Sequence, residues 1–262
     1  MRTLINMNQN RTQRYTTLTI ITGVACAGLC GSVTHAQQAA VVAPKPPGWE
    51  TSAAAGVTLT RGNSDTLLAT LSLDTKRKWE RDEAFGGISG GYGENDDTKN
   101  TEFVKGYAQY NHLFTERFYA GVRLDALYDG IANLDYRVTL SPLVGYYLIK
   151  ETKTSLAVEA GPSVVLEKYK GQSSETYLAA RFAERFEHKL SDTTRIWQSL
   201  EYLPRVDRWA EKYIITAEVG IETAITKKWS LRVVGQDIYD SEPAAGRKKN
   251  DLRLIAGTAY KF

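Results

Sequence analysis

The sequence has little cysteine and little histidine, and both scarcities exclude classes of chemistry. Its two cysteines, Cys26 and Cys30, lie near the N-terminus, so the rest of the chain has no disulfide, thiol nucleophile or thiolate metal site. The three histidines, His35, His112 and His188, are far apart. Scattered histidines without cysteine form no ligand cluster. We therefore predict no metal, no cofactor and no catalytic residue.

Long apolar runs are also missing after residue 32. The mean hydropathy is −0.35, and the only run approaching membrane-helix length covers residues 16–32. A membrane helix needs about 20 apolar residues, so the composition excludes a bundle of membrane helices. Any membrane role must come from strands.

Residues 1–36 are predicted to be a cleaved secretory signal peptide. Arginines precede the apolar run, and Thr34 and Ala36 place small residues at the −3 and −1 positions of a cleavage site. An uncleaved membrane anchor is the alternative, which the short, Thr- and Gly-interrupted run disfavours. A lipid anchor on Cys26 or Cys30 is also disfavoured, since neither has Leu three positions before it.

The excess positive charge belongs to this N-terminal segment. The chain carries a formal charge of +3, and residues 1–36 hold Arg2, Arg11 and Arg14 but no acid. Cleavage therefore leaves +3 − 3 = 0, and no basic stripe remains for nucleic acid. Residues 37–48 are Pro-rich and are predicted to form a stiff, extended lead-in.

From residue 49 onward, apolar and polar side chains alternate with period two, the spacing of strands whose faces meet different surroundings. Strands of this length exceed the usual mode of about 5 to 6 residues and are long enough to cross a membrane, which takes about 9 to 11. We therefore predict that residues 49–262 form an all-β, up-and-down antiparallel transmembrane β-barrel of about twelve strands. They are expected near residues 50–60, 66–79, 83–93, 100–113, 117–129, 134–149, 154–167, 175–189, 194–204, 211–225, 229–240 and 250–262.

The connections between these strands are of two alternating kinds. One kind is short and has aromatic neighbours that we expect to form an interfacial girdle: Trp79, Phe114, Phe118, Trp197 and Trp229. The other kind is richer in Gly, Asn, Asp and Ser, and several members are longer, as near residues 62–65, 94–99, 130–133, 169–174, 205–210 and 240–249. This alternation is typical of short periplasmic turns and longer outer loops.

A periplasmic β-sandwich or a filled soluble barrel would show the same alternation with the apolar face turned inward. The polar face favours the membrane barrel, because it mixes small residues, tyrosines and both charge signs. The chain ends in Phe262, with Tyr260 on the same face. This ending is similar to the signal by which the outer-membrane barrel insertion machinery recognises its substrates. We predict this machinery and outer-membrane lipid as partners, the oligomeric state being open.

Three groups of segments carry a family resemblance. They are Gly62-Asn63-Ser64-Asp65-Thr66, then Asp135-Tyr136-Arg137 leading to Gly145-Tyr146-Tyr147-Leu148-Ile149, and Asn250-Asp251 leading to Tyr260-Lys261-Phe262. In their order and spacing they resemble the salt-induced outer membrane protein family, also called the domain of unknown function 481 family. The resemblance implies a bacterial outer-membrane barrel. It implies no catalytic residue, because the family has no generally established activity.

Charged residues on the polar face are the candidate site. We predict that twelve of them line the lumen: Arg123, Asp125, Arg137, Glu159, Glu167, Arg181, Arg185, Glu201, Glu218, Glu222, Arg232 and Arg253. They form either a structural salt-bridge network that fills the barrel or a polar lining for solutes. Turn positions place Arg137 beside Glu167 and Glu159 beside Arg185, where opposite charges stabilise a sheet by about 0.2 to 1 kcal/mol.

The sequence thus predicts a non-enzymatic component of the bacterial outer membrane, or a narrow channel for small solutes or ions. A purely structural or partner-binding barrel is the alternative. An outer-membrane hydrolase is less well supported, since His112 and His188 fall at the predicted periplasmic ends of strands. The glycines between Gly86 and Gly93 lie inside an alternating strand without a following helix, so they do not form a phosphate loop.

Overall fold

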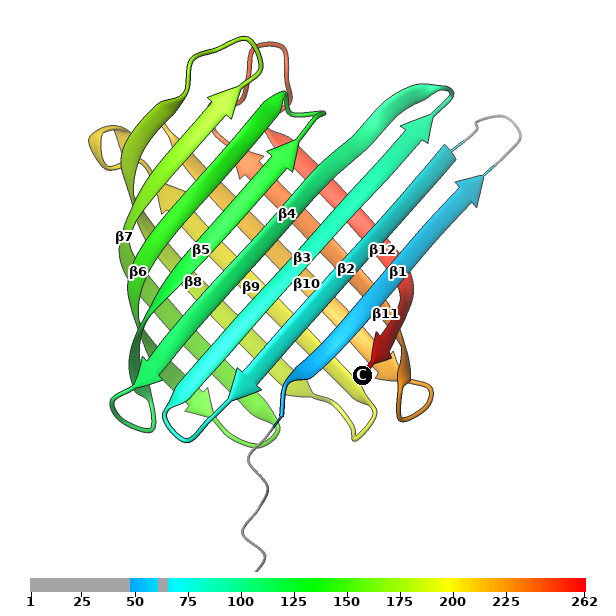
Figure 1. The fold of residues 1–262 in the computed structure, drawn as a ribbon, viewed down its shortest axis with the longest axis vertical. Helices are drawn as coiled ribbons and strands as arrows, with labels where there is room; N and C mark the ends of the chain where they lie inside the picture. Colours follow the sequence, from blue (N-terminus) through cyan, green and yellow to red (C-terminus); the bar gives the residue numbers. More distant parts are fainter. Residues whose placement is uncertain (1–47, 61–65) are drawn as a thin grey trace, which may run out of the picture. The chain divides into compact units, whose positions relative to one another are not determined.

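The computed structural model describes residues 48–60 and 66–262 (Figure 1). The predicted signal peptide, nearly all of the lead-in and the first loop fall outside these residues. Twelve strands follow one another: β1 Glu50–Thr60, β2 Thr66–Lys78, β3 Asp82–Asn95, β4 Thr98–Leu113, β5 Phe118–Asp129, β6 Leu134–Lys150, β7 Thr154–Tyr169, β8 Glu175–Lys189, β9 Thr194–Pro204, β10 Tyr213–Ala224, β11 Trp229–Asp240 and β12 Asn250–Lys261.

The strands form a closed antiparallel barrel in which each strand pairs with its neighbours in sequence and β1 pairs with β12. This meander confirms the predicted fold class and strand number. We call the end with connections 79–81, 114–117, 151–153, 190–193 and 225–228 the turn end, and the end with connections 96–97, 130–133, 170–174, 205–212 and 241–249 the loop end.

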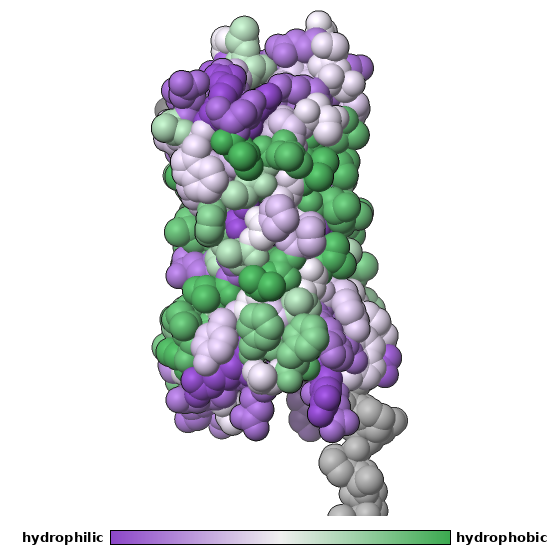
Figure 2. Space-filling model, turned by 90° about the vertical axis from the view of Figure 1, so that its left-hand side faces the viewer, coloured by the Kyte–Doolittle hydropathy of each residue, from purple (hydrophilic) through white to green (hydrophobic). Residues whose placement is uncertain are grey.

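Alternate residues point into and out of the barrel, which sorts polar from apolar side chains. In β6, inward-facing Ser141 and Leu143 are buried, whereas outward-facing Leu140 and Val144 are 46% and 49% exposed. The outer surface is consequently an apolar band between polar ends, as the face in Figure 2 shows. Within the described part of the chain, no helix is long and apolar enough to cross a membrane.

Aromatic side chains gather on the outer surface near both ends. At the turn end, Trp229 packs on Tyr260 with 5.0 Å between ring centroids. At the loop end, Trp209 packs against Phe182 at 5.9 Å. The predicted girdle included Trp197, which is wrong: its indole points inward, where Nε1 donates a hydrogen bond to Glu218 at 2.8 Å.

Two local predictions also differ from the structure. The sequence predicts a connection over residues 94–99, but only Asp96 and Asp97 separate β3 from β4, with φ of 48° and 60°. Two successive positive φ values are those of a tight type I′ hairpin, which Asp tolerates. Leu134 was expected on the apolar outer face, yet it is 3% exposed, because the register shifts between Leu134 and Tyr136.

Candidate functional site

The interior of the barrel is crossed by contacts between strands that are not neighbours. Tyr147 of β6 donates a hydrogen bond to Glu83 of β3 at 2.6 Å, and Gln109 of β4 donates one to Glu159 of β7 at 2.8 Å. Because two strands separate the members of each pair in the sheet, these side chains can meet only inside. The interior is therefore partly filled by polar side chains.

Glu159 is the centre of the largest group, and its side chain is fully buried. It accepts hydrogen bonds from Gln109 Nε2 at 2.8 Å, Tyr119 OH at 2.9 Å, Arg181 Nη1 at 2.9 Å and Arg185 Nη2 at 2.7 Å. Burying a carboxylate costs several kcal/mol unless donors replace its water. Four donors and two guanidinium charges provide that replacement, so we call these residues the Glu159 network.

A second group lies toward the loop end. Arg137 donates to Glu167 at 2.8 Å, and Lys212 of the 205–212 loop donates to the other oxygen of Glu167 at 2.7 Å. Arg137 also reaches Asp240, at the end of β11, at 2.9 Å. A single guanidinium thus links β6, β7 and β11, and the 205–212 loop is tied to the same carboxylate.

Two ion pairs of this region span the bore. Arg137 to Asp240 connects β6 with β11, and Arg253 to Asp129, at 2.5 Å, connects β12 with β5. In the closed order of strands these partners lie on nearly opposite walls. The 241–249 loop adds a contact of the same kind, because Arg247 donates to Asn133 in the 130–133 turn at 2.8 Å. These contacts narrow the loop end of the barrel.

The β9–β10 loop carries its own exposed ion pair. The Arg205 guanidinium donates a hydrogen bond from Nε to Asp207 at 2.7 Å. This hydrogen bond lowers the pKa of the Asp207 carboxyl below its ordinary value of 3.8. Arg208, in the following residue, pairs with Glu242 of the 241–249 loop at 2.7 Å, so the two long loops contact each other through charged groups.

A third group of charged side chains connects β10 and β11 with β2. Arg232 of β11 bonds Glu222 of β10 at 3.0 Å and lies 3.3 Å from Asp74 of β2, with β12 and β1 between. Glu222 also accepts from Arg195 at 2.9 Å. Next to this group, Gln236 donates to Glu218 at 2.8 Å. Both charge signs therefore alternate around the interior, as in a balanced lining.

The inner face of β1 and β2 differs from the rest, because its central side chains are small. Along its middle it presents Ala54, Gly56, Thr70 and Ser72. On the same side of the barrel, β4 is separated from β2 only by β3 and carries the larger Phe103, whose ring lies over Gly91 of β3. The interior is thus filled unevenly, with large charged and aromatic side chains on β4 to β9 and little on β1 and β2.

The structure brings the twelve predicted residues to inward positions, where they join these groups. Arg123 and Asp125 pair with each other, and Arg181 bridges Glu159 and Glu201. Arg137 is directly opposite Glu167, which confirms that predicted register. The second predicted register is wrong by two residues: Glu159 faces Ala183 and Arg185 faces Ala157, so their ion pair, at 2.7 Å, runs diagonally.

Several residues of the interior were not predicted. Asp74, Glu83, Lys105, Tyr147 and Asp240 all take part in it or face it. For Asp74 and Lys105 a signal existed, because each follows an apolar residue, Leu73 or Val104, in an alternating strand. The role of Lys212 had no such signal, since it lies in a loop.

His112, His188 and the chain end lie on the outer surface. His112 contacts Asp82 at 2.8 Å, and His188 contacts Thr154 at 2.8 Å, both toward the turn end. Tyr260 packs against Phe262 at 5.2 Å, and the Phe262 amide donates to the Thr51 carbonyl at 3.0 Å. Within residues 48–60 and 66–262, no group of three or more His, Cys, Asp or Glu could hold a metal ion.

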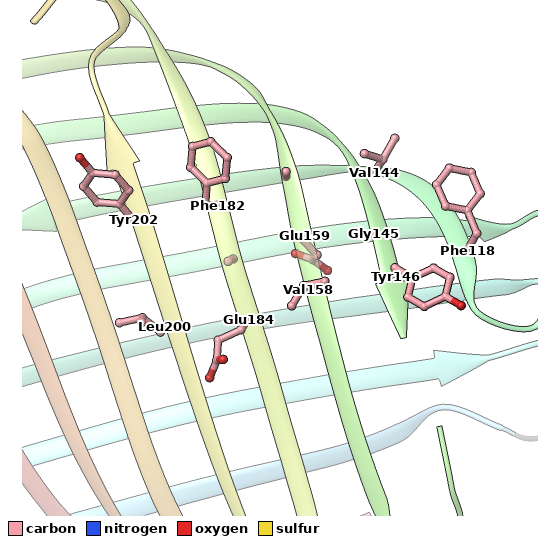
Figure 3. A pocket seen from close by; sticks show the side chains of 12 residues that line it. Phe118, Val144, Gly145, Tyr146, Val158, Glu159, Phe182, Glu184, Leu200 and Tyr202 are labelled. Carbon is pink, nitrogen blue, oxygen red and sulfur yellow. The ribbon is translucent and has the colours of Figure 1, made fainter. Parts of the chain in front are cut away.

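A shallow apolar groove of about 500 Å³ lies on the outside of the wall. Figure 3 shows side chains that border it, among them Phe182 and Tyr202. Glu184, at an outward position opposite Val158 and Leu200, also borders the groove. An outward carboxylate in an apolar wall is costly in lipid, and less so near an interface than at midplane.

No curated protein compared with the chain matches it. Among solved structures, the chain is similar to the NanC porin, with a TM-score of 0.48, 6% identity and coverage of 81% of this chain and 96% of that chain. It is similar to the KdgM porin, with a TM-score of 0.44, 13% identity and coverage of 82% and 99%. It is also similar to an outer membrane channel from Pseudomonas putida F1, with a TM-score of 0.47, 11% identity and coverage of 82% and 93%.

The family comparison covers most of the barrel and confirms the predicted family. Residues 53–262 match the family described as "Protein of unknown function, DUF481", and the chain belongs to this family.

Proposed function

We propose that this barrel spans the bacterial outer membrane after export by a cleaved signal peptide, and that its interior is a narrow passage for small solutes or ions. The outer surface supports the location, because it is apolar between aromatic side chains such as Trp229 at one end and Trp209 at the other. The terminal Phe262, on the same outer face, supports assembly by the barrel insertion machinery.

The observation that carries the passage is the uneven filling of the interior. The Glu159 network occupies the side of β4 to β9, whereas the inner face of β1 and β2 carries small residues at Ala54, Gly56 and Ser72. Barrels of eight strands hold only side chains, and those of 16 to 18 strands hold an aqueous channel. A twelve-stranded barrel with one wall of small residues fits a restricted path, narrowed at the loop end by the Arg253 to Asp129 ion pair.

Single-channel recording of the refolded protein in a planar bilayer tests this function. We expect small conductance steps with weak ion selectivity, because the interior carries both signs of charge without a large surplus. Absence of steps in protein shown to be inserted would overturn the passage. Large, strongly anion-selective currents would overturn the inward assignment of the acidic side chains.

A structural barrel without transport is the second candidate, and the complete pairing of Glu159 favours it. In that case the inserted protein carries no ion current in the bilayer, while substitution of residues in the Glu159 network lowers the free energy of unfolding. Neither candidate is an enzyme, and hydrolysis assays with phospholipid and peptide substrates check that part of the proposal. We also propose that salt induces production of this protein, as in the family that it resembles. Comparing the amount of the protein in cells grown at low and high salt tests this.

A further inference from the structure

The closing seam of the barrel is paired over only part of its length. β1 and β12 pair at four positions, from Ser52 with Lys261 to Ala55 with Thr258. Both strands continue beyond this point, since β1 pairs with β2 up to Thr60 and β12 pairs with β11 from Asn250. Within the described residues, the loop-end halves of β1 and β12 therefore have formed strands with free facing edges.

The paired part of the seam ends at two glycines. Gly56 follows Ala55 in β1, and Gly257 precedes Thr258 in β12. A Cβ on Gly56 would lie 2.6 Å from the Ala256 carbonyl oxygen, and one on Gly257 would meet the Ala55 carbonyl oxygen. The two backbones thus approach closely here, which only glycine permits. Beyond this contact the ladder stops.

The outer side of the free edges is the most exposed apolar part of the wall. Val57 is 70% exposed, and Leu252 and Leu254 are 75% and 70% exposed, against 46% for Leu140 and 68% for Leu71 on strands with a neighbour on both sides. These side chains lack a neighbouring strand on one side. In hydrocarbon, free backbone N–H and C=O groups are not tolerated unless they line a cavity or meet a partner.

The inner side of the seam joins the wall of small residues. Going from β4 to the seam, one row of facing residues is Phe103, Gly91, Thr70 and Gly56. The adjacent row is Lys105, Ser89, Ser72, Ala54 and Ala259. Apart from Phe103 and Lys105 at their β4 ends, these rows contain only small side chains, and they run from the interior wall to the free edges.

Lys105 differs from the other inward cations. Arg137, Arg181 and Arg253 each have a carboxylate partner within 2.9 Å. Among the residues that the structure describes, Lys105 has no ion-pair partner, and the charges that act on it most strongly are those of Glu218 and Arg253. The Phe103 ring, two residues away, instead lies under the Arg253 guanidinium at 4.3 Å. A cation without an ion-pair partner is complementary to an anionic head group.

We propose that the unpaired half of the β1–β12 seam is a lateral opening, through which a single-chain amphiphile with an anionic head passes between the interior and the surrounding lipid. The head group binds Lys105, and the chain lies along Thr70 and Gly56 and leaves between Val57 and Leu254. This inference rests on the location in the outer membrane that the proposed function includes, and it adds a sideways exit to the proposed axial passage.

A disulfide across the seam tests the opening in the full chain with Cys26→Ala and Cys30→Ala. Leu59→Cys with Leu254→Cys would close the unpaired half, because continuing the observed register places these positions opposite each other. Ala55→Cys with Thr258→Cys is the matched control in the last observed pair. We expect the control to oxidise rapidly and the Leu59/Leu254 pair slowly, since a disulfide needs Cα atoms about 4.4 to 6.8 Å apart and this pair lies beyond the last paired position of the seam.

Transfer of a fluorescent pyrene-labelled hexadecanoate into vesicles containing each variant gives the functional result. Locking Leu59/Leu254 should stop protein-dependent transfer, and reduction should restore it, while the Ala55/Thr258 disulfide leaves transfer unchanged. Equal oxidation rates of the two pairs would overturn the opening. Undiminished transfer in the locked variant would overturn the lateral route.

A second variant keeps the test informative if the Leu59/Leu254 disulfide does not form. Lys105→Ser should slow transfer of the carboxylate about tenfold, the effect of losing about 1.4 kcal/mol of binding, and should leave transfer of the matching pyrene-labelled alcohol unchanged. Equal effects on both probes would overturn the head-group site. Ion conductance, recorded on the same variants, reports the axial passage separately, so its absence counts against the proposed function and not against the lateral opening.

Discussion

The guanidinium of Arg185 on β8 lies 5.0 Å from the centre of the Phe85 ring on β3, with β4 to β7 between them in the sheet. Arg185 also holds Glu159. One side chain therefore ties the Glu159 network to a distant part of the wall, and its cation–π contact in a desolvated interior contributes about 2 kcal/mol.

Replacing Glu159 with Ala should destabilise the barrel by about 3 to 5 kcal/mol, because Arg181 loses a buried partner. Urea-induced unfolding in lipid vesicles, followed by tryptophan fluorescence, measures this change. Glu80→Ala, at an exposed turn position, is the control and should stay within about 0.5 kcal/mol of the parent. An unchanged unfolding free energy for Glu159→Ala would mean that the network adds nothing to stability.

Replacing Arg137 and Arg185 together with Ser should increase conductance and shift selectivity toward cations. The change removes two guanidinium groups and leaves Glu167 and Glu159 with less positive charge nearby. Reversal potentials in a salt gradient measure the selectivity. If the interior is only a structural filling, the same variant loses stability while its currents stay at the baseline.

Replacing outward-facing Glu184 with Leu should stabilise the protein in lipid vesicles by about 1 kcal/mol, since a carboxylate in an apolar wall costs less near an interface than at midplane but still costs free energy. The same substitution should change the free energy of unfolding, measured by denaturant titration, by less when the protein is dissolved in short-chain detergent. A loss of stability in vesicles would show that Glu184 faces a polar partner and not lipid.

Replacing Phe262 with Asp should impair outer-membrane assembly while synthesis continues. The side chain is 71% exposed on the outer face, so a charge there removes an apolar terminal residue without disturbing the interior. Fractionation and heat-modifiable gel mobility follow assembly. Normal assembly of this variant would show that the chain ending is incidental, and recovery of the parent protein in the soluble periplasm would contradict the proposed location.

The Asp207 carboxyl should titrate below its ordinary pKa of 3.8, because Arg205 donates a hydrogen bond to its charged form. A lowered pKa in the folded state means that the contact contributes above pH 3.8 and is lost as the pH falls through the lowered value. NMR titration of the carboxyl measures the midpoint. Arg205→Gln should raise it, whereas Arg208→Gln, which removes a charge without that hydrogen bond, should raise it less.

The strands could be predicted from sequence because each has two faces with different surroundings. In β5, Val122 and Leu124 alternate with Arg123 and Asp125, and this period-two alternation predicted both the strand and its inward face. The register of Arg137 with Glu167 followed from the short 151–153 turn, which leaves little choice of pairing. Period-two alternation and turn length are local properties, so both can be recognised in the sequence.

The alternation of residues does not determine which residues of neighbouring strands face each other, or which side chains meet across the barrel. The centre of the longer 170–174 connection could not be located well enough, so the partner of Glu159 was misplaced by two residues, although its face was right. Ion pairs between opposite walls, such as Arg137 with Asp240, depend on closure of all strands. Leu134 was misplaced because a single bulge inverts the alternation locally.

The Arg253 to Asp129 ion pair joins residues 124 positions apart in the chain. Such a contact cannot form until the last strand has taken its place, so until then the Asp129 carboxylate of the fifth strand lacks its cationic partner and has only the amides of Ile131 and Ala132 as donors. Closure of the barrel by β12 and neutralisation of the Asp129 charge are therefore one late event in folding. This event is slow because the residues that it brings together are far apart in the sequence. A nascent barrel waiting for β12 would be an open sheet with a charged, hydrated face, distinguishable from the finished barrel by its sensitivity to protease.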